Sequence, residues 1–183
     1  MTVELRVIED QRGAAEARHK VGALLGAAFS GPPYDRPPNE VEGMLKRYDR
    51  HAHKRGFRLV LALDHGHPVA SVYGFRLPAD TAWWKETLEP VPDEVAFEDG
   101  ERTFAVFELA VAPDHRREHL GARVHEELLR DRPEQRAVLN VRQDAEAAQA
   151  AYKAWGYRRV TSLIPWDNAP LYDVMVLDLR ARP

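Results

Sequence analysis

The sequence contains no cysteine, which excludes several kinds of site at once. Disulfide bonds, thiolate nucleophiles and cysteine-based zinc sites cannot form. The chain also has no apolar run that approaches the length of a membrane span, and its first residues, Met1–Arg6, lack the apolar segment of a signal peptide. We therefore expect a soluble, cytoplasmic protein with no membrane partner.

The chain has no excess of positive charge. Its formal net charge is −3, from 26 Lys and Arg against 29 Asp and Glu. Because a general nucleic-acid-binding protein needs a basic surface, we expect no nucleic-acid partner. The 183 residues are 44% hydrophobic and 30% charged, which is enough to bury a core as a single domain over residues 1–183.

Histidines occur in pairs, but no pair has a third ligand at a suitable spacing. A zinc site needs three or four ligands. We therefore predict no metal site. The pairs are His51 and His53, His65 and His67, and His115 and His119.

The spacing of apolar residues predicts an α/β protein, in which helices and β-strands follow one another along the chain. Helices are predicted to begin near Gly13, at Asn39 as the capping residue, near Leu120, and at Asp144 or Ala145. The order is β-α-α-β-β-β-α-β-α-β-β. Strands are predicted over residues 3–8, 57–63, 68–77, 104–111, 136–141, 157–163 and 171–179.

One strand-turn-helix segment predicts an anion site. Residues 104–111 are typical of a strand, Pro113 favours a turn, and a helix with one apolar face carries Leu120. The first N–H groups of a helix have no intrahelical acceptor, and the helix dipole adds about half a positive charge there. Because Arg116 and Arg117 precede this helix, the segment is expected to bind a phosphate-bearing ligand.

This segment resembles the acetyl-CoA-binding segment of the GNAT N-acetyltransferase superfamily. In that family an Arg or Gln is followed three residues later by Gly and five residues later by Gly or Ala. Arg116 and Gly121 fit, whereas His119 stands at the first glycine position. Either the His119 ring points outward and the site survives, or cofactor binding is weakened. The resemblance implies acetyl-CoA as cofactor, bound by Leu109, Ala110, Val111, Arg116, Arg117, Glu118, His119, Leu120, Gly121 and Ala122.

A second segment, residues 141–157, resembles the later motif of the same superfamily. Ala145 replaces the family's asparagine, which contacts the pantetheine arm in relatives. The two motifs together imply the GNAT fold, a central mixed, mostly antiparallel sheet of about seven strands flanked by about four helices. They add Ala148 and Tyr152 to the cofactor-binding residues. The positions that match are Ala148, Tyr152, Gly156 and Tyr157.

The resemblance also implies roles in acetyl transfer. A lysine-type amine, with a pKa of about 10.4, must lose a proton before it attacks. Glu108 is the candidate base, directly or through water, and Tyr152 is the candidate acid for the departing thiolate. The resemblance suggests that backbone N–H groups of the central strand near Leu109–Val111 bind the oxyanion. In relatives this strand is splayed from the next one, which leaves its polar groups free for the pantetheine arm.

An aromatic-walled acceptor pocket is expected by the same resemblance. With acidic residues near it, the expected substrate is a small-molecule primary amine, such as an amine-bearing antibiotic or metabolite. A protein N-terminus or lysine is the alternative substrate, and a non-catalytic acyl-CoA-binding or sensing domain is the alternative of another class. Adjacent tryptophans also suit a subunit contact, as in a homodimer. The predicted substrate-binding residues are Phe29, Tyr34, Tyr73, Trp83 and Trp84.

Overall fold

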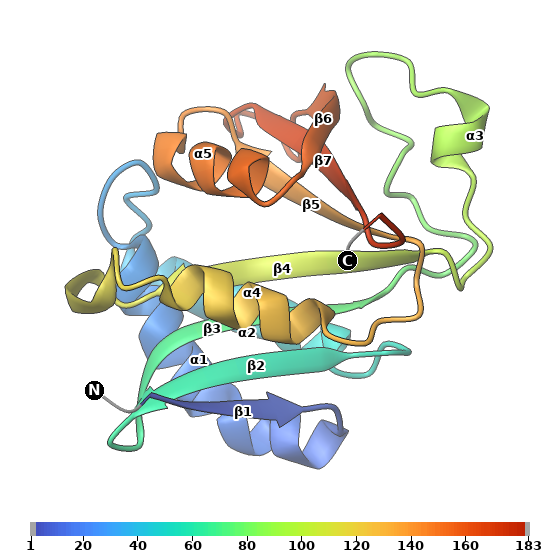
Figure 1. The fold of residues 1–183 in the computed structure, drawn as a ribbon. Helices are drawn as coiled ribbons and strands as arrows, with labels where there is room; N and C mark the ends of the chain where they lie inside the picture. The colour runs from blue at the N-terminus through green and yellow to red at the C-terminus, as the bar shows by residue number, and fades with distance from the viewer. Residues whose placement is uncertain (1–2, 182–183) are drawn as a thin grey trace. The chain divides into compact units, whose positions relative to one another are not determined.

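The computed structural model describes residues 3–181, which form a seven-stranded sheet with helices (Figure 1). The strand order is β1-β2-β3-β4-β5-β7-β6, which confirms the predicted α/β class and sheet size. The elements are β1 (Glu4–Ile8), α1 (Gln11–Phe29), α2 (Pro38–His51), β2 (Arg58–Asp64), β3 (His67–Arg76), α3 (Asp93–Ala96), β4 (Thr103–Val111), the 3-10 turn η1 (Pro113–His115), α4 (Leu120–Leu129), β5 (Arg136–Arg142), α5 (Glu146–Ala154), β6 (Arg158–Leu163) and β7 (Tyr172–Asp178).

The chain divides into two compact units. Unit 1 extends up to Phe75 and includes Val106–Arg132, and unit 2 comprises Arg76–Ala105 and the residues from Pro133 onward. The division passes through β3 and β4, so each of these strands contributes to both units. That the chain forms a single domain stays a prediction.

In unit 1, helices cover both faces of the antiparallel strands β1, β2 and β3. Glu4 pairs with Leu63, and Arg58 pairs with Gly74. Helix α4 packs on β2 and β1, whereas α1 and α2 pack on each other behind the sheet in Figure 1. The Tyr48 hydroxyl of α2 donates a hydrogen bond to the Ala14 carbonyl of α1 at 2.8 Å, which fixes the two helices against each other.

In unit 2, β7 lies between β5 and β6 and is antiparallel to both. The first residues of β4 run parallel to β5, with Thr103 paired with Arg136. Helix α5 packs on β5. The long segment between β3 and β4 belongs to this unit and carries both Trp83 and Trp84.

One buried carboxylate holds that long segment in place. Glu98 Oε1 accepts hydrogen bonds from Arg136 Nη2 at 2.8 Å, Thr103 Oγ1 at 2.8 Å and Trp84 Nε1 at 3.0 Å. The side chains of Glu98 and Arg136 are only 1% and 8% exposed. Burial lowers the pKa of Arg136 from its ordinary value, while Glu98 acts in the opposite direction.

Two local predictions differ from the structure. Asn39 does not cap α2, because the helix already begins at Pro38 and the cap position is Pro37. Proline suits the first helical turn, where its missing N–H would have no partner anyway. The segment between β3 and β4, for which no helix was predicted, contains the short helix α3, which makes five α-helices in residues 3–181 instead of about four.

Replacement of Glu98 should destabilise the fold strongly. Glu98→Ala leaves the buried Arg136 without its carboxylate, so we expect the free energy of unfolding to fall by about 3–5 kcal/mol. Urea denaturation measures this loss. Glu94→Ala is the matched control in the same segment, because the Glu94 side chain is exposed and its change should stay within about 0.5 kcal/mol. Equal losses for the two variants would contradict the structural role of Glu98.

Candidate functional site

Glu108 interrupts β4 with a left-handed backbone. Its φ is +49°, an uncommon value for a residue other than glycine and one that breaks the regular alternation of a strand. The carboxylate forms an ion pair with Arg47 of α2, and its side chain is 14% exposed. Such strain, on the order of 1–3 kcal/mol, is typical of functional sites. The predicted base therefore lies at an irregular point of the central strand.

Arg47 and Glu108 belong to a half-buried polar group next to Tyr73. Burial lowers the pKa of Arg47, but Glu108 and Tyr73 outweigh this effect and raise it overall. Burial, and then the negative charge of Glu108, raises the pKa of Tyr73, so its hydroxyl keeps its proton. The hydroxyl lies 3.2 Å from His51 Nδ1. Burial, and then Arg47, lowers the pKa of His51 to about 4, so this ring is neutral at pH 7.

Tyr73 lies in the interior of unit 1. It is 1% exposed, and its ring packs edge-on against Tyr48 at 5.2 Å and stacks with Phe107 at 5.7 Å. Tyr73, which was predicted to bind the substrate, is therefore a buried core residue. Phe29 and Tyr34 are half-buried where α1 ends, with ring centroids 4.7 Å apart.

The turn before α4 contains two more left-handed residues. Arg117 has a φ of +66° and His119, the cap position of α4, has a φ of +59°. A position with positive φ suits glycine, and histidine is one of the few other residues enriched there. His119 thus adopts the backbone conformation that a glycine at this motif position would adopt readily, and its side chain is exposed.

The groups around this turn suit an anion. Helix α4 begins at Leu120, so the N–H groups of its first turn have no intrahelical acceptor. Arg117 is exposed and has no ion pair or hydrogen bond among residues 3–181. Arg116 is already engaged, because its Nη2 donates to the Ala28 carbonyl at 2.9 Å. The carboxylate of Glu118 lies 3.2 Å from His115 Nδ1.

The second predicted segment lies in unit 2. Tyr152 of α5 is half-buried, with its ring edge-on to Trp155 at 5.5 Å and to Tyr157 at 5.6 Å. Ala148 lies one turn earlier and is half-buried. Ala145, at the cap position of α5, is 2% exposed and provides no side-chain cap.

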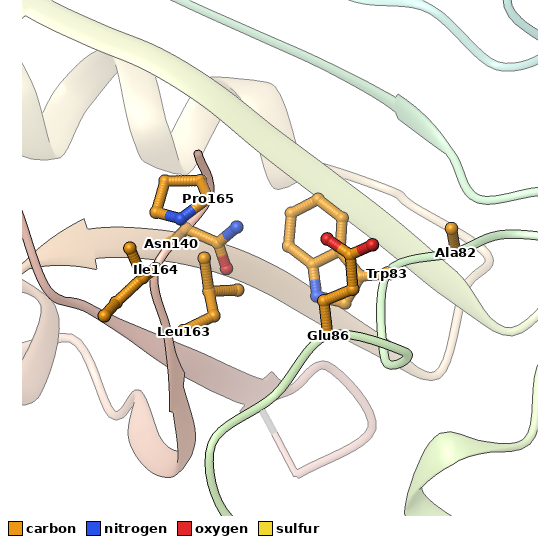
Figure 2. A pocket seen from close by; sticks show the side chains of 7 residues that line it. All are labelled: Ala82, Trp83, Glu86, Asn140, Leu163, Ile164 and Pro165. Atoms are coloured by element: carbon orange, nitrogen blue, oxygen red, sulfur yellow. The ribbon is translucent and has the colours of Figure 1, made fainter. Parts of the chain in front are cut away.

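A small pocket of about 170 Å³ lies in unit 2 (Figure 2). Of the two neighbouring tryptophans, Trp84 is buried and donates a hydrogen bond to Glu98, whereas Trp83 lines this pocket. The lining residues are Ala82, Trp83, Glu86, Asn140, Leu163, Ile164 and Pro165.

Sequence reasoning missed two polar residues of this pocket, Glu86 and Asn140. Asn140 did carry a signal, because it is the one polar residue between the buried residues 137–139 and Val141 of β5. A lone amide in an apolar strand often marks a ligand contact or a buried hydrogen bond. Glu86 carried none, since it is one of several acidic residues in an irregular segment.

Two absences characterise residues 3–181. No group of three or more His, Asp or Glu side chains is arranged to hold a metal ion there. No helix within that range is long and apolar enough to cross a membrane.

One protein family matches the sequence of this chain. Residues 21–157 match the model of the acetyltransferase (GNAT) family. No curated protein matches the chain in sequence.

Solved structures with this fold cover nearly the whole chain at low identity. The ribosomal-protein-S18-alanine N-acetyltransferase of Escherichia coli has a TM-score of 0.66 at 16% identity over 97% of this chain and 94% of that one. Aminoglycoside 6'-acetyltransferase type Ii has a TM-score of 0.66 at 15% identity, with both chains fully covered. YncA of Salmonella typhimurium, solved with its cofactor acetyl-CoA, has a TM-score of 0.61 at 12% identity over 100% of this chain and 97% of that one.

Replacement of His119 by glycine should stabilise the protein. A left-handed backbone costs an L-residue about 1–2 kcal/mol, and glycine loses about 0.5–1 kcal/mol of this gain to its greater freedom when unfolded. We expect His119→Gly to raise the free energy of unfolding by about 0.5–1 kcal/mol in urea denaturation. His67→Gly, at an exposed strand position, is the control and should be destabilising. A loss in His119→Gly as large as that in His67→Gly would contradict the argument.

Proposed function

Since the chain belongs to the acetyltransferase (GNAT) family, we propose that this acetyl-CoA-dependent N-acetyltransferase acts on the primary amine of a small molecule. The observation that carries the choice of a small molecule is the compact pocket of unit 2, lined by Trp83, Asn140 and the carboxylate of Glu86. The fold alone favours neither class of substrate, because a ribosomal-protein acetyltransferase and an aminoglycoside acetyltransferase have the same TM-score to this chain.

The start of α4 is the proposed pyrophosphate site. Its first-turn N–H groups and the exposed guanidinium of Arg117 are donors of the kind that phosphate oxygens need. Arg116 has a different proposed role, since its bond to the Ala28 carbonyl ties the turn to the end of α1. The left-handed conformation of Arg117 and His119 sets the direction of the turn into the helix. Acetyl-CoA supplies the activated acetyl group when it is bound.

Backbone groups that follow Glu108 are proposed to hold the acetyl oxygen. The left-handed residue at position 108 changes the direction of the N–H groups that follow it, among them those of Leu109–Val111. Fixed N–H donors stabilise developing negative charge without reorganising. Ala112 N–H donates to the Val69 carbonyl at 2.9 Å, which anchors the end of β4 on β3.

Glu108 is proposed as the proton acceptor, through water. Its Oε1 is engaged by Arg47, and its other oxygen makes no hydrogen bond to the described residues. The ion pair holds the carboxylate in one position, so a water bound to the second oxygen can receive the proton of the amine. The Tyr73 hydroxyl cannot take this role, because its raised pKa keeps it protonated.

Tyr152 is proposed as the general acid, which gives its hydroxyl proton to the departing thiolate. Tyr152→Phe should lower kcat by about 10²–10⁴-fold, with little change in the unfolding transition. Steady-state kinetics measures this loss. Tyr157→Phe removes a hydroxyl from a contacting ring and serves as the control. Wild-type turnover in Tyr152→Phe would exclude the role.

Calorimetric titration with acetyl-CoA, CoA and a longer acyl-CoA tests the function itself. We expect acetyl-CoA to bind, and a panel of small amines and peptides then identifies the acceptor class. Turnover with small amines supports the proposal, whereas turnover with peptides alone favours a protein N-terminus or lysine. Binding without turnover on either class would favour a non-catalytic acyl-CoA-binding domain, which the replacements at His119 and Ala145 make the second candidate.

The family match over residues 21–157 includes parts of both units, which supports the single-domain prediction. We keep the homodimer as a proposal. Light scattering coupled to size-exclusion chromatography measures the molecular mass of the protein and distinguishes the monomer of 20.8 kDa from a dimer.

A further inference from the structure

We propose that the pocket of unit 2 binds a small organic monocation, a primary ammonium group attached to an apolar body, through Glu86, Trp83 and Asn140. The inference rests on the proposed acetyltransferase function and specifies the chemical class of its amine. In Figure 2, Trp83 and Glu86 line one side of the pocket, and Asn140 lies on the other side with Leu163 and Ile164.

Glu86 differs from three of the other glutamates of its segment. Within residues 3–181 the Glu86 side chain has no ion pair or hydrogen bond, although it lines a pocket. An unpaired carboxylate at a pocket attracts a cation, and it accepts charge-assisted hydrogen bonds from an ammonium group. Three other glutamates of this segment are ion-paired: Glu89 with Arg159, Glu98 with Arg136, and Glu101 with Arg76.

Asn140 provides a second acceptor. It is exposed although its neighbours in β5, Leu139 and Val141, are buried. Its side-chain amide has no hydrogen-bond partner among the residues that the structure describes. The amide carbonyl can accept a second N–H of an ammonium group whose first N–H is bound to Glu86.

The remaining walls suit the apolar part of such a ligand. The indole of Trp83 offers an aromatic face, which attracts cations as well as apolar groups. Leu163, Ile164 and Pro165 add aliphatic surface. This combination of apolar walls with few polar groups is typical of small-molecule sites.

The size of the pocket limits the ligand. Its volume of about 170 Å³ is below the roughly 300–1,000 Å³ of sites for drug-sized ligands. It holds a single ring or a short aliphatic chain with its amine, or one such group of a larger molecule. A whole oligosaccharide antibiotic is too large to be enclosed.

The test uses nuclear magnetic resonance of the indole N–H groups. The chain has four tryptophans, so the spectrum should contain four indole signals, and Trp83→Phe identifies that of Trp83. Phenethylamine is the cationic probe, and 2-phenylethanol is its neutral counterpart of similar shape. We expect phenethylamine to shift the Trp83 signal with saturation, at least fivefold more tightly than 2-phenylethanol, while the signal of the exposed Trp166 stays in place.

Glu86→Gln should weaken phenethylamine binding by about tenfold, because it removes the charge and keeps the shape. It should leave the affinity for 2-phenylethanol unchanged. Asp80→Asn is the matched control, an exposed carboxylate of the same segment outside the pocket, and it should bind phenethylamine as the wild type does.

Equal affinity for the amine and the alcohol, no shift of the Trp83 signal, or a Glu86→Gln variant that binds like the wild type would each overturn the proposal. These measurements need no acetyl-CoA. Failure of acetyl-CoA binding would therefore refute the proposed function while the amine site stands. Turnover of amines that do not compete with phenethylamine would refute the amine site alone.

Discussion

The conformation of unit 2 depends on the buried ion pair between Glu98 and Arg136. Arg136 also donates through Nε to Thr103 Oγ1 at 2.8 Å, and its guanidinium lies 5.0 Å from the centre of the Trp84 ring. One carboxylate thus joins the start of β4, the start of β5 and the long segment between β3 and β4. Burying two charges is costly, and the three hydrogen bonds that Glu98 Oε1 accepts from Arg136, Thr103 and Trp84 offset part of this cost. Because Trp84 is held in this way, the segment presents Trp83 to the pocket instead.

Three left-handed residues lie close together along the chain in unit 1. Glu108, Arg117 and His119 all have positive φ, and all three lie in β4 or between β4 and α4. Such conformations cost energy for L-residues, and they persist only where surrounding contacts fix them. Arg47 fixes Glu108 by an ion pair, and Arg116 ties the turn to the Ala28 carbonyl. The result is an irregular strand followed by a helix whose first-turn N–H groups have no intrahelical acceptor.

Several site features followed from the sequence because they depend on local pattern. The strand over residues 104–111 and the helix carrying Leu120 were predicted from apolar spacing, and the structure confirms both within a residue. Asn39 was wrongly predicted as a cap, since a local rule for capping residues competes with the preference of proline for the first helical turn. Glu86 was missed because its lack of an ion pair within the described residues is a property of the fold. No local sequence pattern encodes which glutamates form ion pairs with arginine.

The sequence by itself determined the alternation of strands and helices, the turn with two arginines before α4 and membership of the acetyltransferase family, because each of these rests on residues that lie close together along the chain. Only the tertiary structure decided which of two adjacent tryptophans is buried, that Tyr73 belongs to the core, and that Asn140 and Glu86 line one pocket. The physical reason is distance along the chain. Residues 86 and 140 meet through packing of β5 against a segment that Glu98 holds, and such long-range contacts are energetic outcomes of the whole fold.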